Sequence, residues 1–403
     1  MLSASARPLI AASVPVLREY GEAITRCFYH RMFEAHPELK SLFNLGNQAS
    51  GAQQQALAGA VYAYAANIDN REALAPVLSR IAHKHASVGI TPAQYTIVGK
   101  YLLGAIAEVL GAAATLELLA AWDEAYWLLA VELIAMEARL YQQAQHKPGN
   151  WQEMRVIRKE QESDVVTSLY LQPVDGKPLP HFRPGQYISV ALDVESIQHR
   201  QLRQYSLSDA PGKDWWRITV KRESINNEMI PAGMISNMLH DQVEVGSTLC
   251  VSPPFGDFVL NEDVKKPLVL LSAGVGVTPM ISMLNSVKHN QPERPVVFAH
   301  AARNGRLHAM KKDILDAKNR SISTIIFYEE PADEDRQGKD YDHQGRMRLD
   351  KISDINLPLD ADYYLCGPVP FMREQRRTLL DSGIDPTRIR CEVFGPDLLN
   401  GLH

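Results

Sequence analysis

The first 141 residues carry apolar side chains at the three- and four-residue spacing of amphipathic helices. The segment is rich in Ala, Leu, Glu and Gln, and the spacing repeats in successive stretches. The apolar positions are Leu74, Val77, Leu78, Ile81 and Val88, then Val98, Leu102, Ala105, Ile106 and Val109, then Trp122, Tyr126, Leu129, Leu133, Met136 and Leu140. Residues that recur in this way line one face of a helix, so the pattern predicts an all-helical domain over residues 1–141.

The pattern changes after residues 142–150, where Lys147-Pro148-Gly149 favours a linker. From Trp151, short runs rich in β-branched and aromatic residues alternate with proline and glycine, which predicts a small β-barrel or sandwich over residues 151–264. These runs include Val165 to Leu171, Tyr187 to Leu192 and Arg217 to Val220.

Strand-like and helix-like segments alternate over residues 265–403, as is typical of a doubly wound parallel sheet. Strands are expected at Pro267 to Ser272, Pro295 to Ala299, Thr324 to Tyr328, Asp362 to Cys366 and Arg390 to Phe394. The fold class is therefore multidomain, with an all-α unit, a β unit and an α/β unit in that order.

Charge and composition exclude several classes of protein. The chain has 403 residues, with 42 basic and 47 acidic side chains and no basic block, which argues against a nucleic-acid partner. The apolar stretch from Leu118 to Met136 is interrupted by Asp123, Glu124 and Glu132, so it predicts an amphipathic helix rather than a membrane span. No basic segment leads into a signal-peptide core, and the four cysteines are scattered. We expect a soluble cytoplasmic protein with free thiols.

Two motifs in the second half of the chain indicate electron transfer. Arg203-Gln204-Tyr205-Ser206 places a cation, an aromatic ring and a hydroxyl together beside a strand, which suits a flavin and its pyrophosphate. The loop from Ala273 to Met280 joins an apolar strand to a helix through Gly274 and Gly276, which suits a second dinucleotide. Each residue alone has a plainer explanation: Arg203 as a surface ion pair, and Pro279 as the first residue of a helix.

The helical half carries polar residues on apolar stripes. His85 lies on the stripe of its helix, four residues after Ile81, whereas His83 does not. A lone histidine there is more often a satisfied core residue than a metal ligand. Glu137 lies on another stripe, where burial is costly without a partner. Tyr95, on the connection that follows the His85 helix, would complete a chain from Glu137 to Tyr95 to His85, which would make the imidazole a more electron-donating ligand.

Tyr29, Gln53 and Leu57 would form the opposite wall of the same pocket. Gln53 begins an apolar stripe that continues through Leu57, and Tyr29 lies beside Phe28 and Met32 on an earlier helix. Gln53 and Tyr29 have a plainer alternative: each would lie on a helix surface or be a capped polar group of the core.

The second half of the chain resembles the ferredoxin-NADP reductase family over about 250 residues. The landmarks occur in the family's order: Pro184-Gly185-Gln186-Tyr187, Arg203 to Ser206, Gly233 to Asn237 with Ser236, Ala273 to Met280, Cys366-Gly367-Pro368, and Glu392-Val393-Phe394-Gly395-Pro396 with Asp397. The resemblance implies an FAD-binding antiparallel β-barrel over residues 151–264 and an NAD(P)-binding α/β domain over residues 265–403.

The resemblance also implies roles for individual residues. Arg203 would pair with the flavin pyrophosphate, with Gln204 beside it; Tyr205 and Ser206 would contact the isoalloxazine, and Tyr187 would belong to the same site. Gly233 and Ser236 would form the second flavin segment. The loop Ala273, Gly274, Val275, Gly276, Val277 and Thr278 would receive the nicotinamide coenzyme. Phe394 would cover the other flavin face, Glu392 would tune its electrostatics, and Gly395, Pro396 and Asp397 would complete this terminal segment.

Two positions depart from the family pattern. Ser224 to Ile230 stands where relatives carry a glycine-rich stretch, so the conformation of the 224–232 segment is open. Ala273 stands where glycine is commoner, a small change of low cost.

The helical half resembles the globin half of bacterial flavohaemoglobins. The residues at matching spacings are Tyr29, Pro37, Phe43, Gln53, Leu57, His85, Tyr95 and Glu137, together with the segments Cys27-Phe28-Tyr29 and Lys84-His85-Ala86-Ser87. By this resemblance residues 1–141 are a globin domain that holds haem b, His85 is the proximal iron ligand, and Phe43 packs on the haem. Lys84 would affect the haem and flavin potentials. Tyr29 and Gln53 would hydrogen-bond bound O2, and Leu57 would restrict the space above the iron.

The family resemblance implies a nitric oxide dioxygenase, in which electrons pass from NAD(P)H to FAD to haem and NO and O2 become nitrate. A flavin converts a two-electron hydride donor into one-electron steps that iron accepts. Two alternatives stay open: a sensor globin that binds O2 or NO, kept ferrous by its reductase, and a general NAD(P)H-dependent flavin or ferric reductase. We expect a monomer. The choice between NADH and NADPH, a lipid in the distal pocket and anaerobic NO chemistry are left open.

Overall fold

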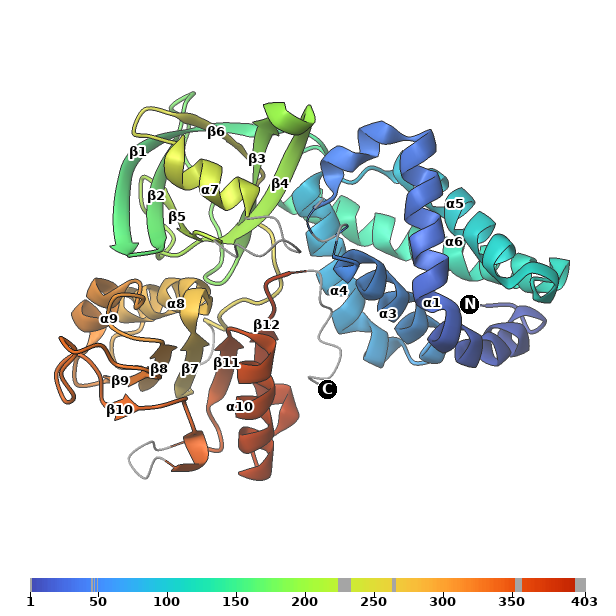
Figure 1. Cartoon of the computed structure of the whole chain (residues 1–403). Coiled ribbons are helices and arrows are strands. Elements are labelled where there is room, and N and C mark those ends of the chain that lie inside the picture. The colour runs from blue at the N-terminus through green and yellow to red at the C-terminus, as the bar shows by residue number, and fades with distance from the viewer. Residues whose placement is uncertain are drawn as a thin grey trace.

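The computed structural model describes residues 2–395 except 45, 47, 49, 224–232, 263–265 and 352–356. Three units follow one another along the chain: a helical bundle, a β-barrel and an α/β unit (Figure 1). The fold class predicted from the sequence is confirmed. The four cysteines are free thiols, also as predicted.

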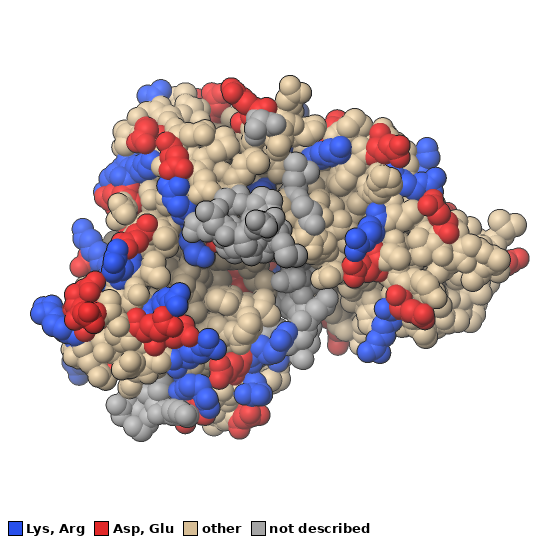
Figure 2. All heavy atoms as spheres, in the orientation of Figure 1, with Lys and Arg blue, Asp and Glu red and all other residues tan. Residues whose placement is uncertain are grey.

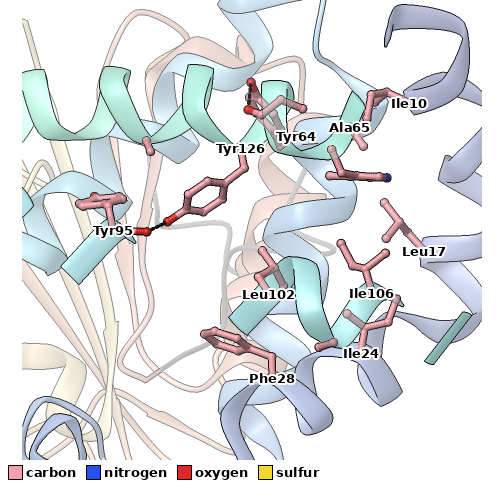
Figure 3. Close-up of a cluster of buried hydrophobic side chains, with 14 of the residues drawn as sticks. Ile10, Leu17, Ile24, Phe28, Tyr64, Ala65, Tyr95, Leu102, Ile106 and Tyr126 are labelled. Atoms are coloured by element: carbon pink, nitrogen blue, oxygen red, sulfur yellow. Dashed lines mark hydrogen bonds between the residues drawn. The ribbon is translucent and has the colours of Figure 1, made fainter. Parts of the chain in front are cut away.

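The helical unit consists of long helices that surround an apolar core. Its α-helices are α1 (Ala6–Ala35), α3 (Ala52–Ala66), α4 (Arg71–Val88), α5 (Pro92–Leu110) and α6 (Leu116–Gln143), with the 3₁₀ helices η1 (Pro37–Leu42) and η2 (Gly111–Ala113). Helix α1 packs against α3, α5 and α6, and α4 packs against α6. In Figure 3, Ile24 and Phe28 of α1 lie close to Leu102 and Ile106 of α5 within this core.

One helix, Pro92–Ala113, is long and apolar enough to cross a membrane by length and composition. A core helix of a soluble protein passes the same test, and α5 packs against both α1 and α6. It is the one such helix among the described residues, and one helix is weak evidence for a span. On the face shown in Figure 2, acidic and basic side chains are intermixed over all three units.

The β unit is a closed antiparallel barrel. Its strands are β1 (Gln152–Ser163), β2 (Val166–Pro173), β3 (Tyr187–Val194), β4 (His199–Ser206), β5 (Trp216–Lys221) and β6 (Thr248–Val251), in the spatial order β4-β3-β6-β1-β2-β5. The end strands meet where Leu207 pairs with Ile218 and the Ser208 amide donates to the Arg217 carbonyl at 2.8 Å. A short 3₁₀ helix, η3 (Glu195–Ile197), joins β3 to β4, and helix α7 (Met234–Asp241) packs against β5.

The α/β unit is a six-stranded parallel sheet in the order β10-β9-β8-β7-β11-β12. The strands are β7 (Leu268–Ala273), β8 (Val296–Ala302), β9 (Ile322–Tyr328), β10 (His343–Gln344), β11 (Asp362–Cys366) and β12 (Ile389–Glu392). The helices are α8 (Val277–Asn290), α9 (Lys311–Ala317) and α10 (Val369–Asp381), with the 3₁₀ helices η4 (Gly274–Gly276), η5 (Leu349–Lys351) and η6 (Pro386–Arg388). Side chains of α8 and α9 form one buried cluster and those of α10 form another, so the sheet is covered on both faces.

A buried polar network holds the barrel against the α/β unit. The Arg217 guanidinium, only 5% exposed, forms a bidentate ion pair with Asp313 of α9 at 3.0 and 3.1 Å. Asn285 of α8 donates to Asp313 at 2.9 Å and to Asp209 of the barrel at 3.0 Å. Ser282 donates to the Asp209 carbonyl at 2.7 Å. Breaking one member of such a network leaves a buried charge unpaired, so the network strongly favours one relative placement of the two units.

Candidate functional site

Three polar side chains of the helical unit converge on one point. The His85 Nδ1 lies 2.8 Å from Oε1 of Glu137 and 3.0 Å from the hydroxyl of Tyr95. The Tyr95 hydroxyl donates to the same Oε1 atom at 2.5 Å. Glu137 is 3% exposed, so its carboxylate is satisfied by these two partners rather than by water. Burial and the neighbouring carboxylate raise the pKa of Tyr95, which therefore stays protonated and donates.

The local sequence between His85 and Tyr95 turns the chain sharply. Helix α4 ends at Val88 and is capped by Gly89, whose φ of 86° is left-handed. The amides of Gly89 and Ile90 both donate to the His85 carbonyl. Helix α5 begins at once with a capping box between Thr91 and Gln94. Tyr95 thus lies in the first turn of α5 rather than on a connection, and this turn faces the last turn of α4.

The close approach of α5 to α6 brings Glu137 into the cluster. A β-carbon on Gly99 would lie 2.5 Å from the ring of Tyr126 in α6. The Tyr126 hydroxyl donates to the backbone carbonyl of Tyr95, and Figure 3 shows the two side by side. The sequence predicted a linear chain with Tyr95 in the middle. In the structure Glu137 instead contacts both His85 and Tyr95, because α4 and α6 pack directly against each other.

The cluster fits a site in which His85 would hold haem iron. Glu137 and Tyr95 engage Nδ1, and the part of the chain that the structure describes offers no hydrogen bond to Nε2 of His85. The His85 side chain is 35% exposed, although its carboxylate partner is buried. A histidine whose one nitrogen is held by a carboxylate and whose other is free is a common metal ligand.

Residues predicted for the opposite wall of the pocket lie near one another in the helical unit. Tyr29 is buried, and the side chains of Gln53 and Gln48 lie near its hydroxyl, where they oppose the rise in pKa that burial causes. The ring of Phe43 lies edge-on to Tyr29 with ring centroids 5.6 Å apart, and Leu57 packs against the same core. Burial raises the pKa of Tyr29, which keeps its hydroxyl protonated and able to donate. The structure therefore groups Tyr29, Gln53 and Phe43 as neighbours.

The predicted flavin residues meet on two adjacent strands. In the antiparallel register of β3 and β4, Tyr187 is opposite Ser206 and Val190 is opposite Arg203. Arg203 is half-buried, and its guanidinium donates to the Leu202 carbonyl at 2.7 Å. No ion pair joins it to a carboxylate among the described residues. A partly buried arginine without a counter-charge fits a pyrophosphate.

The other predicted flavin residues lie on exposed positions, on α7, or outside the described residues. Gln204 is exposed, and its amide donates to Ser189 at 3.2 Å. Gly233 and Ser236 lie at the N-terminus of α7, where free backbone amides favour an anion. Residues 224–232, Pro396 and Asp397 lie outside the described residues.

The dinucleotide loop follows β7 as predicted from the sequence. Gly274 has a φ of 54°, with no atom near the position of a β-carbon, so its backbone is open to a ligand. A β-carbon on Gly276 would lie 2.3 Å from the Cys366 carbonyl, which brings the loop against the end of β11. The Thr278 hydroxyl donates to the Val275 carbonyl at 3.0 Å. The β-carbon of Ala273 faces Gly367. A β-carbon added at Gly367 would lie only 3.1 Å from it, so the glycine at 367 leaves room for the alanine at 273.

Helix α4 is also where the helical unit meets the reductase units. The Lys84 Nζ donates to the Gly395 carbonyl at 2.8 Å, beside the exposed ring of Phe394. Burial raises the pKa of Glu392 to about 7, while the positive charges of Arg80 and Lys84 oppose that rise. Of the contact residues on α4, sequence reasoning missed Arg80 and Ser87. A count of polar positions at helical spacing along α4 would have indicated them.

Comparison with known proteins agrees with this organisation. A globin family model matches residues 26–133, and an oxidoreductase NAD-binding domain model matches residues 270–377. The chain is 49% identical over 403 residues to a flavohemoprotein of Rhizobium meliloti (strain 1021), with 99% of each chain covered. It is 51% identical over 401 residues to a flavohemoprotein of Bordetella parapertussis, which covers 98% of this chain and 99% of the relative.

Solved structures show the same relation. The flavohemoglobin from Malassezia yamatoensis with bound FAD and heme aligns with a TM-score of 0.85 at 32% identity, covering 98% of this chain and 100% of that chain. The FAD/NAD-binding domain of nitric oxide dioxygenase from Vibrio cholerae O1 biovar El Tor aligns with a TM-score of 0.55 at 34% identity, covering 61% of this chain and 99% of that domain. This chain therefore belongs to the flavohemoprotein family.

Proposed function

We propose that this protein is a nitric oxide dioxygenase that converts two NO and two O2, with one NAD(P)H, into two nitrate ions, NAD(P)+ and H+. Its cofactors are haem and FAD, and electrons pass from NAD(P)H to FAD to the haem iron. The observation that carries the proposal is the His85–Tyr95–Glu137 cluster, whose His85 lies on α4, the helix that contacts the reductase through Lys84. An oxidoreductase of this composition agrees with the globin and NAD-binding matches.

The chain supplies positioning and polarity around the two cofactors. Glu137 and Tyr95 orient the His85 ring and increase its electron donation. Tyr29, with Gln53 near it, would place a hydroxyl donor on the other side of the pocket, and Leu57 would limit the space there. Haem supplies the site at which O2 and NO react, and FAD splits the hydride pair into single electrons. Arg203 would neutralise the FAD pyrophosphate, and Gly274 and Gly276 would admit the coenzyme phosphates.

Consumption of NO tests the proposal directly. Purified protein loaded with haem and FAD should remove NO from aerated buffer with NADH and form nitrate in equal amount, followed with an NO electrode and nitrate analysis. Ligand binding without turnover would favour the sensor alternative. Protein purified without a Soret band would favour the general reductase. A cytoplasmic location and a monomeric state remain predictions.

The pH dependence of stability should depend on Glu392. A carboxyl with a folded pKa of about 7 and an ordinary unfolded pKa binds more protons when folded, so its stabilising contribution is complete below about pH 4.3 and is lost as pH rises through 7. The free energy of unfolding should fall by about 2 kcal/mol between pH 5 and 7 from this group. Urea unfolding of Glu392→Gln should lack this slope. The exposed Glu195→Gln serves as a control that retains it, and an unchanged slope in Glu392→Gln would refute the assignment.

The coenzyme preference should depend on Glu330. The coenzyme crevice lies at the carboxyl ends of the strands, where Arg303 follows β8. The Arg303 guanidinium is ion-paired with Glu330 at 2.8 Å. The 2′-phosphate of NADPH would therefore meet a carboxylate instead of a free cation. We therefore expect a preference for NADH.

Replacing the carboxylate should weaken that preference. Glu330→Gln should raise kcat/KM for NADPH about fivefold to tenfold and leave that for NADH unchanged, measured by coenzyme oxidation. Glu329→Gln is the matched control, because Glu329 pairs with Arg346 instead. An equal change for both coenzymes would contradict this role of Glu330.

A further inference from the structure

Helix α4 presents one polar stripe to the reductase units. The stripe begins at Arg80 and continues three, four and seven residues later with His83, Lys84 and Ser87. This spacing puts all four on a single face of the helix. Each has a partner across the boundary. Arg80 and Lys84 attract Glu392, and the Ser87 side chain lies near the hydroxyl of Tyr187. The stripe therefore faces the elements that carry the flavin residues.

His83 accepts a hydrogen bond from the barrel. The backbone amide of Gly256 donates to the His83 Nδ1 at 3.0 Å. Phe255, the preceding residue, exchanges two backbone hydrogen bonds with Tyr187, of 2.8 and 2.9 Å. Gly256 itself has a φ of 121°, and a β-carbon there would lie 3.1 Å from the Tyr187 ring. The Gly256 amide donates to His83, and the pairing of Phe255 with Tyr187 of β3 fixes the position of that amide.

An apolar contact reinforces this hydrogen bond. Phe255 is buried against Ala86 of α4 and Tyr141 of α6, with the two aromatic rings edge to face at 6.1 Å. Ala86 lies three residues beyond His83 and one beyond His85. The same turn of α4 therefore holds the Phe255-Gly256 segment and carries the candidate iron ligand.

We propose that His83 is a positioning residue for electron transfer between flavin and haem, and that it acts by accepting the Gly256 amide proton. Because Gly256 is adjacent to Tyr187 and His83 is two residues from His85, this one hydrogen bond ties the flavin strand to the helix of the proximal histidine. The rate of electron transfer falls steeply as the distance between two cofactors grows. Loss of this hydrogen bond should therefore slow electron transfer from flavin to haem. The inference rests on the flavin-to-haem electron flow of the proposed function, and not on NO as the substrate.

Two substitutions separate the hydrogen bond from the bulk of the ring. His83→Leu keeps an apolar side chain of similar reach but offers no acceptor, which leaves the Gly256 amide unpaired. His83→Asn places a carbonyl oxygen about where Nδ1 lies and can accept the same proton.

Stopped-flow spectroscopy of the haem- and FAD-loaded full chain, mixed with NADH without oxygen, gives the two rates separately. In His83→Leu, flavin reduction should be unchanged and haem reduction should slow about tenfold, as expected for the loss of one hydrogen bond between the units. His83→Asn should restore most of the haem reduction rate. These rates do not involve NO, so failure to consume NO would leave this result intact.

Hydrogen–deuterium exchange gives a readout that does not depend on activity. The peptide that contains Gly256 should exchange faster in His83→Leu than in the unsubstituted protein, and His83→Asn should return it toward the original rate. Unchanged haem reduction in both variants would overturn the proposal. Equal slowing by both variants, with exchange at Gly256 unaltered, would also overturn it, because the ring and not the acceptor would then be responsible.

Discussion

Replacing His85 by alanine is expected to abolish haem binding and with it the Soret band, while NADH still reduces the flavin. The imidazole is the one group in the cluster with a free nitrogen to offer to iron, because Glu137 and Tyr95 occupy the other. The predicted flavin residues Tyr187 and Arg203 to Ser206 lie on β3 and β4 of the barrel, and no predicted flavin residue belongs to this cluster. Absorption spectra of the purified variant, before and after NADH, measure both effects.

A histidine elsewhere in the helical unit provides the control. His30→Ala removes an exposed imidazole from α1 and should leave the Soret band intact. Full retention of haem in His85→Ala would show that another residue is the ligand.

Replacing Glu137 by glutamine should lower the rate of NO consumption about 10-fold to 100-fold. The carboxylate accepts from both His85 and Tyr95, so its loss removes the charge that makes the imidazole electron-rich. Resonance Raman spectroscopy should show a weaker iron–histidine bond. A buried glutamine also brings an amide donor that the site does not need.

Tyr95→Phe distinguishes the branched arrangement from a linear chain. Because His85 contacts Glu137 directly at 2.8 Å, loss of the Tyr95 hydroxyl should have the smaller effect on both the rate and the iron–histidine bond. If Tyr95→Phe were as damaging as Glu137→Gln, the linear order that the sequence suggested would be correct and the direct contact would be unimportant.

These predictions depend on contacts that helical spacing alone could not provide. Spacing placed Glu137 on a buried-looking stripe and so indicated that a polar partner must exist. It did not show that α4 and α6 pack closely enough for His85 to be that partner, because the residues are 52 positions apart in the chain. Gly99 permits the approach of α5 and α6, and nothing in its sequence context marks it as an interface glycine.

In the reductase half too, sequence patterns predicted the elements, while the contacts between them came from the tertiary structure. The strands expected from alternation agree closely with β7, β8, β9, β11 and β12, because runs of β-branched residues between turns leave few alternatives. Arg203 could be assigned to a flavin only by resemblance to a family. Its lack of a carboxylate partner among the described residues is a tertiary fact, as is the pairing of Arg303 with Glu330.

By itself, the sequence determined the order of three units and the type of each, because periodicity and turn residues act over short distances. It also suggested which motifs carry flavin and dinucleotide chemistry. The tertiary structure alone decided which surfaces meet. It placed the polar stripe of α4 against Gly256, Tyr187 and Glu392, and it brought Glu137 onto His85. A periodic pattern specifies which side of a helix is buried or polar, but the partner of that side depends on packing between segments far apart in the chain.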